Sequence, residues 1–517
     1  MKSSSHKTVL TTLLTTMATQ ATFSGIATAA ATGGKTKWTD WSSTGPPTEV
    51  DAVVIGGGFS GLTAAYDLQQ SGLSTVVLEA RGRLGGRSWS YQLESGPGIV
   101  ELGATWINNS TQPSVFGLAE KFGLTTIEQY IKGDQIIQGP DGEVFRLPPL
   151  DELSVDPSPE PSPELEALQL AGTLMALINE AADKIDIRRP DQFPEEQDVT
   201  VAEWVAQQGL WDNLVVQAFT RQLTSTLVGR EPHELGVQYF LDYVKSGLGF
   251  DSLGSEKPDG AQYLMIKEGT SAIATELAKA MTAGSVLTNA PATSIVQTKD
   301  HVIVSTKSGQ KFKSKKVIMA NPTNTYKEID FAPGLPEEKK IVVSNTMPGI
   351  YAKMILTYSS PWWREGGLQG KFTSLVGPAC FGWEISVPEL SQYSLAVFVS
   401  GGVAREWHQL PADQQKKSII EHMGQMVGEE LAEKAHDVLE VNYVEWTKEE
   451  HIWGGPTSSM GPGLLRKHGQ ALREPFGHVH FAGGETAFEW KGYLEGAVTA
   501  GQRAAKEVIG SLKGKKE

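Results

Sequence analysis

The sequence predicts an α/β fold in which a discontinuous Rossmann-like domain receives an inserted α+β domain. Three observations favour this class: a glycine-rich turn between a strand and a helix near the N-terminus, a second glycine-rich block near the C-terminus, and a long helical region between them. With 517 residues the chain is longer than one ordinary domain. We therefore expect two domains built from interleaved segments.

The composition excludes several classes of function. Lys and Arg number 45 against 60 Asp and Glu, which gives a net charge of −15 and disfavours a nucleic-acid partner. Cys380 is the single cysteine, so the chain can form no internal disulfide, no cysteine-based zinc cluster and no iron–sulfur centre. Redox chemistry would therefore need an organic cofactor.

The N-terminal segment 1–34 resembles a signal peptide, with a basic start, an apolar centre and small residues at its end. A disordered tail, or more weakly a mitochondrial transit peptide, fits the same residues. The run is too rich in threonine for a transmembrane helix, so we expect no integral membrane anchor. The mature protein is predicted to be soluble, secreted if the segment is cleaved and cytoplasmic otherwise. Residues 35–49 form a linker, and 511–517 form a tail.

The first strong element is a nucleotide-binding fingerprint. An apolar strand, 51–55, leads into Gly56, Gly58 and Gly61 in G-x-G-x-x-G spacing, and a helix-like segment, 62–70, follows. The first glycine allows the tight turn, the second lets the backbone approach a pyrophosphate, and the third lets helix and strand pack closely. Phosphates would sit at the helix N-terminus, beside Phe59 and Ser60.

A second strand, 74–78, ends at Glu79, which is placed to accept hydrogen bonds from both ribose hydroxyls. A carboxylate there disfavours a 2′-phosphate. These elements alone leave NAD and FAD open, because both carry the same adenosine diphosphate end.

Two longer motifs resolve that choice through a resemblance. After Glu79 the chain reads Ala-Arg-Gly-Arg-Leu-Gly-Gly-Arg over 80–87 and Glu-Leu-Gly-Ala-Thr-Trp over 101–106; near the C-terminus, 479–487 and 490–504 form a second block. Together these resemble the flavin-containing amine oxidase family, and the C-terminal block is most similar to its monoamine oxidase branch. The resemblance extends from about Asp51 to Ile509.

The resemblance implies FAD as the cofactor and a monoamine-oxidase-like FAD-binding domain. Arg81 and Arg87 would bring positive charge to the pyrophosphate. Glu485 would approach the ribityl-phosphate end, and Leu494 would open a last long helix whose positive end faces the flavin. The further cofactor contacts expected from the motifs are Ala80, Gly86, Gly103, Ala104, Thr105, Trp106, Ala292, Trp453 and Gly484.

The resemblance also implies a reacting face. Lys353, in an apolar strand, matches the lysine that holds a water near the flavin, and Tyr493 matches one wall of an aromatic cage around the amine. A lysine on a strand edge that reaches solvent is the alternative for Lys353.

The second wall departs from the family pattern. Pro456 replaces the flavin-linking cysteine of animal monoamine oxidases, and Thr457 replaces the neighbouring aromatic residue. We therefore expect noncovalent FAD and, with Thr457 among the catalytic residues, a wider or more polar pocket. Alternatively, Trp446 or Trp453 fills the gap.

The resemblance implies the domain boundaries. The FAD-binding domain would comprise 50–130, 263–325 and 446–510, and the substrate-binding domain 131–262 and 326–445.

The function implied is FAD-dependent oxidative deamination of a primary amine by oxygen, giving an aldehyde or ketone, ammonia and hydrogen peroxide. Bulky or long-chain amines suit the expected pocket. The partners are thus a small amine and oxygen, and a homo-oligomer is compatible with the sequence. Polyamine oxidase, L-amino acid oxidase, a flavin dehydrogenase with a protein acceptor and a non-catalytic nucleotide-binding scaffold are the alternatives.

Overall fold

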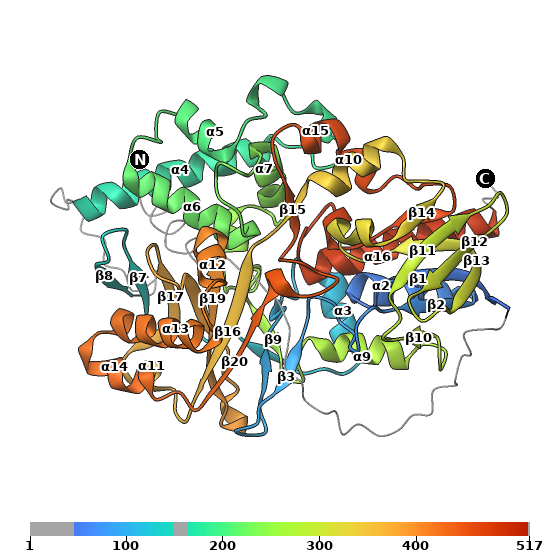
Figure 1. Ribbon diagram of the computed structural model, residues 1–517. Helices are drawn as coiled ribbons and strands as arrows, with labels where there is room; N and C mark the ends of the chain where they lie inside the picture. Colours follow the sequence, from blue (N-terminus) through green and yellow to red (C-terminus); the bar gives the residue numbers. More distant parts are fainter. Residues whose placement is uncertain (1–45, 149–162, 515–517) are drawn as a thin grey trace.

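The computed structural model describes residues 46–148 and 163–514 (Figure 1). The predicted signal-like segment 1–34, most of the linker and the end of the tail lie outside these ranges.

The first of two large sheets has β1 (Thr48–Ile55) near its middle, with strands in the order β10-β2-β1-β13-β12-β11-β14 and β22 paired with β13. β1 runs parallel to both of its neighbours, as expected for a Rossmann-like core. The predicted strand, turn and helix at the fingerprint are all present. The other strands of this sheet are β2 (Thr75–Leu78), β10 (Val286–Leu287), β11 (Ala292–Gln297), β12 (Val302–Thr306), β13 (Lys311–Met319), β14 (Asp330–Ala332) and β22 (Val479–Phe481).

Two helices from opposite ends of the sequence pack together beside this sheet. They are α2 (Phe59–Gln70) and α16 (Leu494–Lys513), seen side by side in blue and red in Figure 1. A Cβ on Gly501 would lie 2.2 Å from the carbonyl oxygen of Ser60, so only glycine permits this approach. The apolar cluster beneath them also takes in α9 (Ser271–Lys279) and α3 (Pro113–Lys121).

The second sheet has the order β20-β16-β19-β18-β17-β7-β8. β16 (Tyr351–Tyr358) is buried at every position and pairs with a strand on each side. The alternative of a strand-edge lysine at Lys353 is therefore wrong. The remaining strands of this sheet are β7 (Asp134–Gln138), β8 (Val144–Leu147), β17 (Leu368–Ser374), β18 (Phe381–Glu384), β19 (Tyr393–Ser400) and β20 (Glu440–Glu445).

The region from Pro163 to Leu253 is helical, as expected, and the next strand, β9, begins at Leu264. Its central helix is α7 (Val237–Ser246), whose residues are buried except for Lys245. The neighbouring helices are α4 (Pro163–Asp183), α5 (Val201–Gln207), α6 (Leu214–Val228) and α8 (Phe250–Leu253).

Shorter elements connect these layers. The strands are β3 (Ser90–Gln92), β4 (Ile99–Glu101), β5 (Trp106–Ile107), β6 (Thr126–Glu128), β9 (Leu264–Ile266), β15 (Thr346–Pro348) and β21 (Ser458–Met460). The helices are α10 (Glu337–Asn345), α11 (Trp362–Glu365), α12 (Gly401–Trp407), α13 (Ala412–Val427), α14 (Glu429–His436) and α15 (Leu464–His468).

Strand β14 lies beyond residue 325, where the substrate-binding domain was expected to resume, but pairs with β11 of the first sheet. In the described part of the chain, no helix combines the length and apolar character that a membrane crossing requires.

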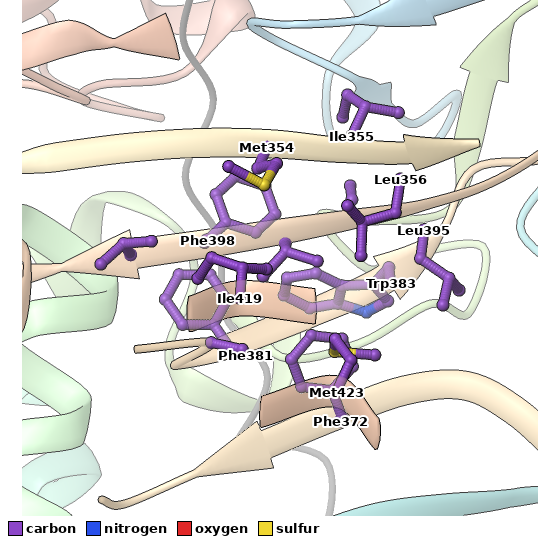
Figure 2. Close-up of a cluster of buried hydrophobic side chains, with 14 of the residues drawn as sticks. Met354, Ile355, Leu356, Phe372, Phe381, Trp383, Leu395, Phe398, Ile419 and Met423 are labelled. Carbon is purple, nitrogen blue, oxygen red and sulfur yellow. The ribbon is translucent and has the colours of Figure 1, made fainter. Parts of the chain in front are cut away.

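A large apolar cluster supports the second sheet (Figure 2). Phe381 is fully buried there and stacks on Phe398, with ring centroids 4.8 Å apart and planes 9° apart. Trp383 meets both rings edge-on. The cluster fixes the layer on which Lys353 lies.

Replacing Phe381 with alanine removes a buried ring and leaves a cavity, so we expect the free energy of unfolding to fall by about 3–5 kcal/mol. Thermal unfolding of the variant and the wild type would measure this loss. Leu214, whose exposed fraction is 75%, provides the control, because Leu214→Ala should change stability by less than about 0.5 kcal/mol. Equal effects at both positions would contradict the assigned core.

Candidate active site

A cavity at the carboxyl end of β1 is lined by residues of both glycine-rich motifs. The empty space within it and at its mouth amounts to about 1290 Å³, part of which is open to solvent. Many of the predicted cofactor residues line it: Gly56, Gly58, Phe59, Ser60, Glu79, Ala80, Arg81, Gly86, Arg87, Ala104, Ala292, Gly484 and Leu494, together with Tyr493.

The three fingerprint glycines have three different surroundings. Gly56 has a φ of 107°, which glycine adopts easily. A Cβ on Gly61 would lie 1.9 Å from the carbonyl oxygen of Gly56, so this position allows α2 to pack on the turn. A Cβ on Gly58 would meet no protein atom closer than 3.7 Å and Gly58 lines the cavity, so its missing side chain leaves room for a ligand.

Glu79 is held by the backbone of the turn. Its two carboxylate oxygens accept hydrogen bonds from the N–H groups of Gly57, at 2.6 Å, and Arg81, at 2.8 Å. Each oxygen keeps further acceptor capacity toward the cavity, since a carboxylate offers about four lone-pair sites.

Arg87 joins the two motifs. Its guanidinium makes a bidentate ion pair with Glu485, with 2.9 Å between Nη2 and Oε2, and also donates to the carbonyl oxygen of Pro456 at 2.7 Å. Glu485 therefore reaches the cavity through Arg87 and does not itself line it. Nearby, the N–H of Gly483 donates to Ser60 Oγ at 2.9 Å.

Arg81 has a partner that the sequence reasoning missed. Its guanidinium contacts the carboxylate of Glu449, and burial raises the pKa of Glu449 to about 7. No local motif marks this acid, which lies far along the chain from Arg81. The pair holds Arg81 at the cavity wall.

Lys353 is fully buried, with an exposed fraction of 1%. Its ammonium donates to the carbonyl oxygen of Gly103 at 2.9 Å and to Thr105 Oγ1 at 2.7 Å. These two residues were predicted to contact the cofactor; in the structure they lie outside the cavity wall and contact Lys353. Trp106 likewise lies off the wall and donates to Gln129 at 2.7 Å.

A buried carboxylate acts on Lys353. Burial lowers the pKa of the lysine to about 7, and the charge of Glu101 opposes this change. Burial also raises the pKa of Glu101 to about 7, and its Oε2 has no hydrogen-bond partner. The two groups therefore titrate as one unit. Glu101 is the first residue of the 101–106 motif, and an acidic residue in that motif was the one sequence feature that could have indicated a partner for Lys353.

The aromatic surroundings of Tyr493 differ from both sequence alternatives. The rings that pack against it within the described residues are those of Trp490, at 5.0 Å, and Tyr243, at 6.1 Å between centroids. Trp446 is fully buried in the cluster beside the second sheet. Trp453 has an exposed fraction of 40% and a φ of 60°, and its indole donates to Glu328. Neither tryptophan fills the gap, and Trp453 does not line the cavity.

Helix α7 supplies side chains at that gap. Tyr239 and Tyr243 are one turn apart on it, and Tyr239 Oη lies 3.4 Å from Thr457 Oγ1. A Cβ on Gly492 would lie 3.1 Å from Tyr243 Oη and 3.4 Å from Thr457 Cβ, so these groups meet at one point. The spacing of Tyr239 and Tyr243 in the sequence predicts that they share a helix face, but no nearby motif indicates that this face packs against Tyr493.

The hydroxyl groups of Tyr243 and Tyr493 are buried and hydrogen-bond to each other. Neither has a further hydrogen-bond partner among the described residues. A hydroxyl group can accept as well as donate, so the pair keeps hydrogen-bonding capacity for a ligand. Because Tyr493 lines the cavity, the tyrosine pair marks a part of the wall where a small polar molecule can be held.

Known proteins resemble the chain over most of its length. A family model described as flavin containing amine oxidoreductase matches residues 59–509. A flavin-containing amine oxidase of Oncorhynchus mykiss is 32% identical over 469 residues, 89% of this chain and 85% of the relative. Flavin-containing amine oxidase B of Sus scrofa is 29% identical over 481 residues, 89% of this chain and 86% of the relative.

Solved structures of two amine oxidases are also similar to this chain. Cyclohexylamine oxidase from Brevibacterium oxydans has a TM-score of 0.81 at 28% identity, over 90% of this chain and 100% of that one. Putrescine oxidase bound to putrescine has a TM-score of 0.81 at 25% identity, with the same coverage. The predicted α/β class, with cofactor-binding and substrate-binding parts, is confirmed.

The glycine surroundings separate binding from folding. Gly58→Ala should fold normally, because its φ of −79° and its surroundings accept a methyl group, but should retain flavin about tenfold less well, because the methyl group enters the cavity. Flavin released on dilution and thermal unfolding of the apoprotein would measure the two properties.

Gly61→Ala is the matched variant, and it should lower the unfolding temperature of the apoprotein itself, because its Cβ collides with the backbone of Gly56. Unchanged flavin affinity in Gly58→Ala would contradict the placement of the phosphates beside that glycine.

Proposed function

Because the chain belongs to the flavin-containing amine oxidoreductases, we propose that it deaminates a primary amine to an aldehyde or ketone, with release of ammonia and hydrogen peroxide. The observation that carries this proposal is the pair of buried tyrosines, Tyr243 and Tyr493, whose hydroxyls have no partner beyond each other and of which Tyr493 lines the cavity. The following roles are inferred from the contacts of the described residues.

FAD fits the cavity residues. The N-terminus of α2 and the free space at Gly58 would take the pyrophosphate, and Glu79 would accept from the ribose. When bound, FAD accepts the hydrogen from the carbon next to the amine nitrogen and passes the electrons to oxygen. The chain supplies the binding, the orientation and the exclusion of water.

We expect this FAD to be bound without a covalent link. Pro456 stands where a linking cysteine would stand, and it lines the cavity. Cys380 is buried in the cluster beside the second sheet, and burial raises the pKa of its thiol to about 11, so it is a core residue without a thiolate.

Lys353 would hold a water at the flavin side of Gly103 and Thr105. Two of its three ammonium hydrogens are taken by those residues, which fixes its direction. A neutral Lys353 can also accept a hydrogen bond from the water, whereas a charged one can only donate. We therefore infer that the neutral form is the working form.

The amine would lie against Tyr493, with Tyr243 and Thr457 beside it. An electron-rich ring orients an amine nitrogen, and the hydroxyl groups of the three residues add polarity. Thr457 is smaller than an aromatic ring, so we infer room for bulky or long-chain amines.

The structure offers little support for substrates with a second charge. The acid nearest the tyrosines in sequence, Asp242, is paired with Lys491, and Glu485 is paired with Arg87. A polyamine would need a carboxylate without such a partner. An amino acid would need an arginine for its carboxylate, and Arg87 is already engaged by Glu485.

Precipitation of the purified protein with acid tests the cofactor and the reaction together. We expect a yellow supernatant, because no link holds FAD, and peroxide from primary alkylamines but not from putrescine, spermidine or amino acids. Visible spectra and a coupled peroxide assay measure these. A yellow pellet would contradict noncovalent binding, and a flavin that no amine bleaches would contradict the proposed activity.

Glu101→Gln tests the lysine. The charge of Glu101 raises the pKa of Lys353, so its removal should lower that pKa below about 7. If neutral Lys353 is the working form, the rise of kcat with pH should move to lower pH in the variant. Profiles of kcat against pH with one amine would show the shift, since the titration of the amine itself is common to both enzymes.

Lys353→Met is the reference for this comparison and should abolish that rise. A rise that stays in place in Glu101→Gln would contradict the coupling between the two groups.

A further inference from the structure

Two buried ionisable side chains lie on the segments that carry Tyr493 and Tyr243, and burial lowers the pKa of one of them, Lys491, to about 7. Lys491 is in the turn that leads into α16, and Asp242 is on α7. Both side chains have an exposed fraction of 3%, and the ammonium of Lys491 contacts Oδ1 of Asp242. The Lys491 ammonium also lies 5.5 Å from the ring centroid of Tyr239. A buried ion pair contributes little net stability, because removing two charges from water offsets their attraction. Its presence therefore calls for another role.

The turn that carries Lys491 has a strained backbone. Trp490 has a φ of 53° and Gly492 a φ of 82°, so left-handed residues stand on both sides of the lysine. For a tryptophan this conformation costs on the order of 1–3 kcal/mol, so it persists only where the surroundings hold it.

Helix α7 provides most of that support. The N–H of Trp490 donates to the carbonyl oxygen of Ser246 at 2.7 Å, and the N–H of Lys491 donates to Ser246 Oγ at 3.3 Å. The ion pair with Asp242 is the side-chain member of this set. The last turn of α7 thus fixes the turn at 490–493.

The same two segments carry the tyrosine pair. Asp242 precedes Tyr243 on α7, and Lys491 stands two residues before Tyr493. The ion pair and the ring pair, at 6.1 Å, therefore bridge the same two segments side by side. We expect that loss of the pair between Lys491 and Asp242 would also shift Tyr493 relative to Tyr243, because the two pairs are only one or two residues apart on each segment.

We propose that the ion pair between Lys491 and Asp242 is a positioning pair that sets Tyr493 against Tyr243 at the amine site. The inference rests on the proposed function, in which Tyr493 contacts the amine. Neither charge touches the substrate; both act through the direction of the Tyr493 ring.

The single variants Lys491→Met and Asp242→Asn each leave one buried charge without a partner. With hexylamine as the probe, each should raise KM about tenfold and change kcat less, because the substitutions disturb the binding of the amine more than the binding of the flavin. The double variant should be less impaired than either single one, since it removes both charges. Flavin content should equal that of the wild type.

Lys245→Met is the matched control. Lys245 lies on the same helix and pairs with Asp183, but the exposed fractions of these side chains are 35% and 79%, so the pair is in contact with solvent. Its loss should leave KM unchanged.

Combination with Tyr493→Leu decides between positioning and a general structural role. If Lys491 acts through Tyr493, then Lys491→Met should add little to the loss already caused by Tyr493→Leu. Additive losses in kcat/KM would overturn the inference. If Lys491→Met yields no folded holoprotein, Asp242→Asn combined with Tyr493→Leu gives the same comparison. A wild-type holoprotein that oxidises no primary amine would overturn the proposed function and the inference with it, whereas additive losses in an active enzyme overturn the inference alone.

Discussion

The buried ammonium of Lys353 links the second sheet to the segment that follows the nucleotide fingerprint. It belongs to β16 of the second sheet, but both of its hydrogen bonds go to the segment 103–105, which follows the nucleotide fingerprint. A lysine side chain that is buried away from water must make hydrogen bonds or lose its charge. Lys353 makes two hydrogen bonds, and burial also lowers its pKa to about 7. Lys353 therefore ties the second sheet to the segment 103–105, at the position that we propose for the reaction.

A similar constraint closes the cofactor cavity. The strand and turn at 51–61 come from the start of the described chain, and Glu485 comes from near its end. The N–H of Gly483 donates to Ser60 Oγ, Arg87 of the following motif pairs with Glu485, and Gly501 lets α16 lie against the first turn of α2. Close backbone approach and paired charge thus act together.

Local signals predicted the parts of this architecture that local physics determines. The fingerprint glycines required a turn, the apolar run before them required a strand, and the start of the last helix at Leu494 followed from its motif. The surroundings of Tyr493 could not be predicted in this way. Tyr243 lies 250 residues before it in sequence, and only the fold brings the two rings together. Trp453 was predicted to contact the cofactor, whereas in the structure its backbone is left-handed, its indole donates to Glu328 and it does not line the cavity. Lys353 was placed correctly as a buried residue, but its partner Glu101 was not recognised.

The pairing of charges bears on which form of an amine the site accepts. Near the tyrosines, Glu485 is paired with Arg87 and Asp242 with Lys491, and Glu449 is paired with Arg81 at the cavity wall. An ammonium group beside Tyr493 would lose its hydration without gaining one of these carboxylates. A neutral amine loses less hydration and meets the hydroxyls of Tyr243 and Tyr493, which have no partner beyond each other. In the proposed reaction the neutral form is also the reactive one, because the nitrogen lone pair assists removal of hydrogen from the adjacent carbon. We therefore infer that the distribution of charge favours binding of the protonation state that can react.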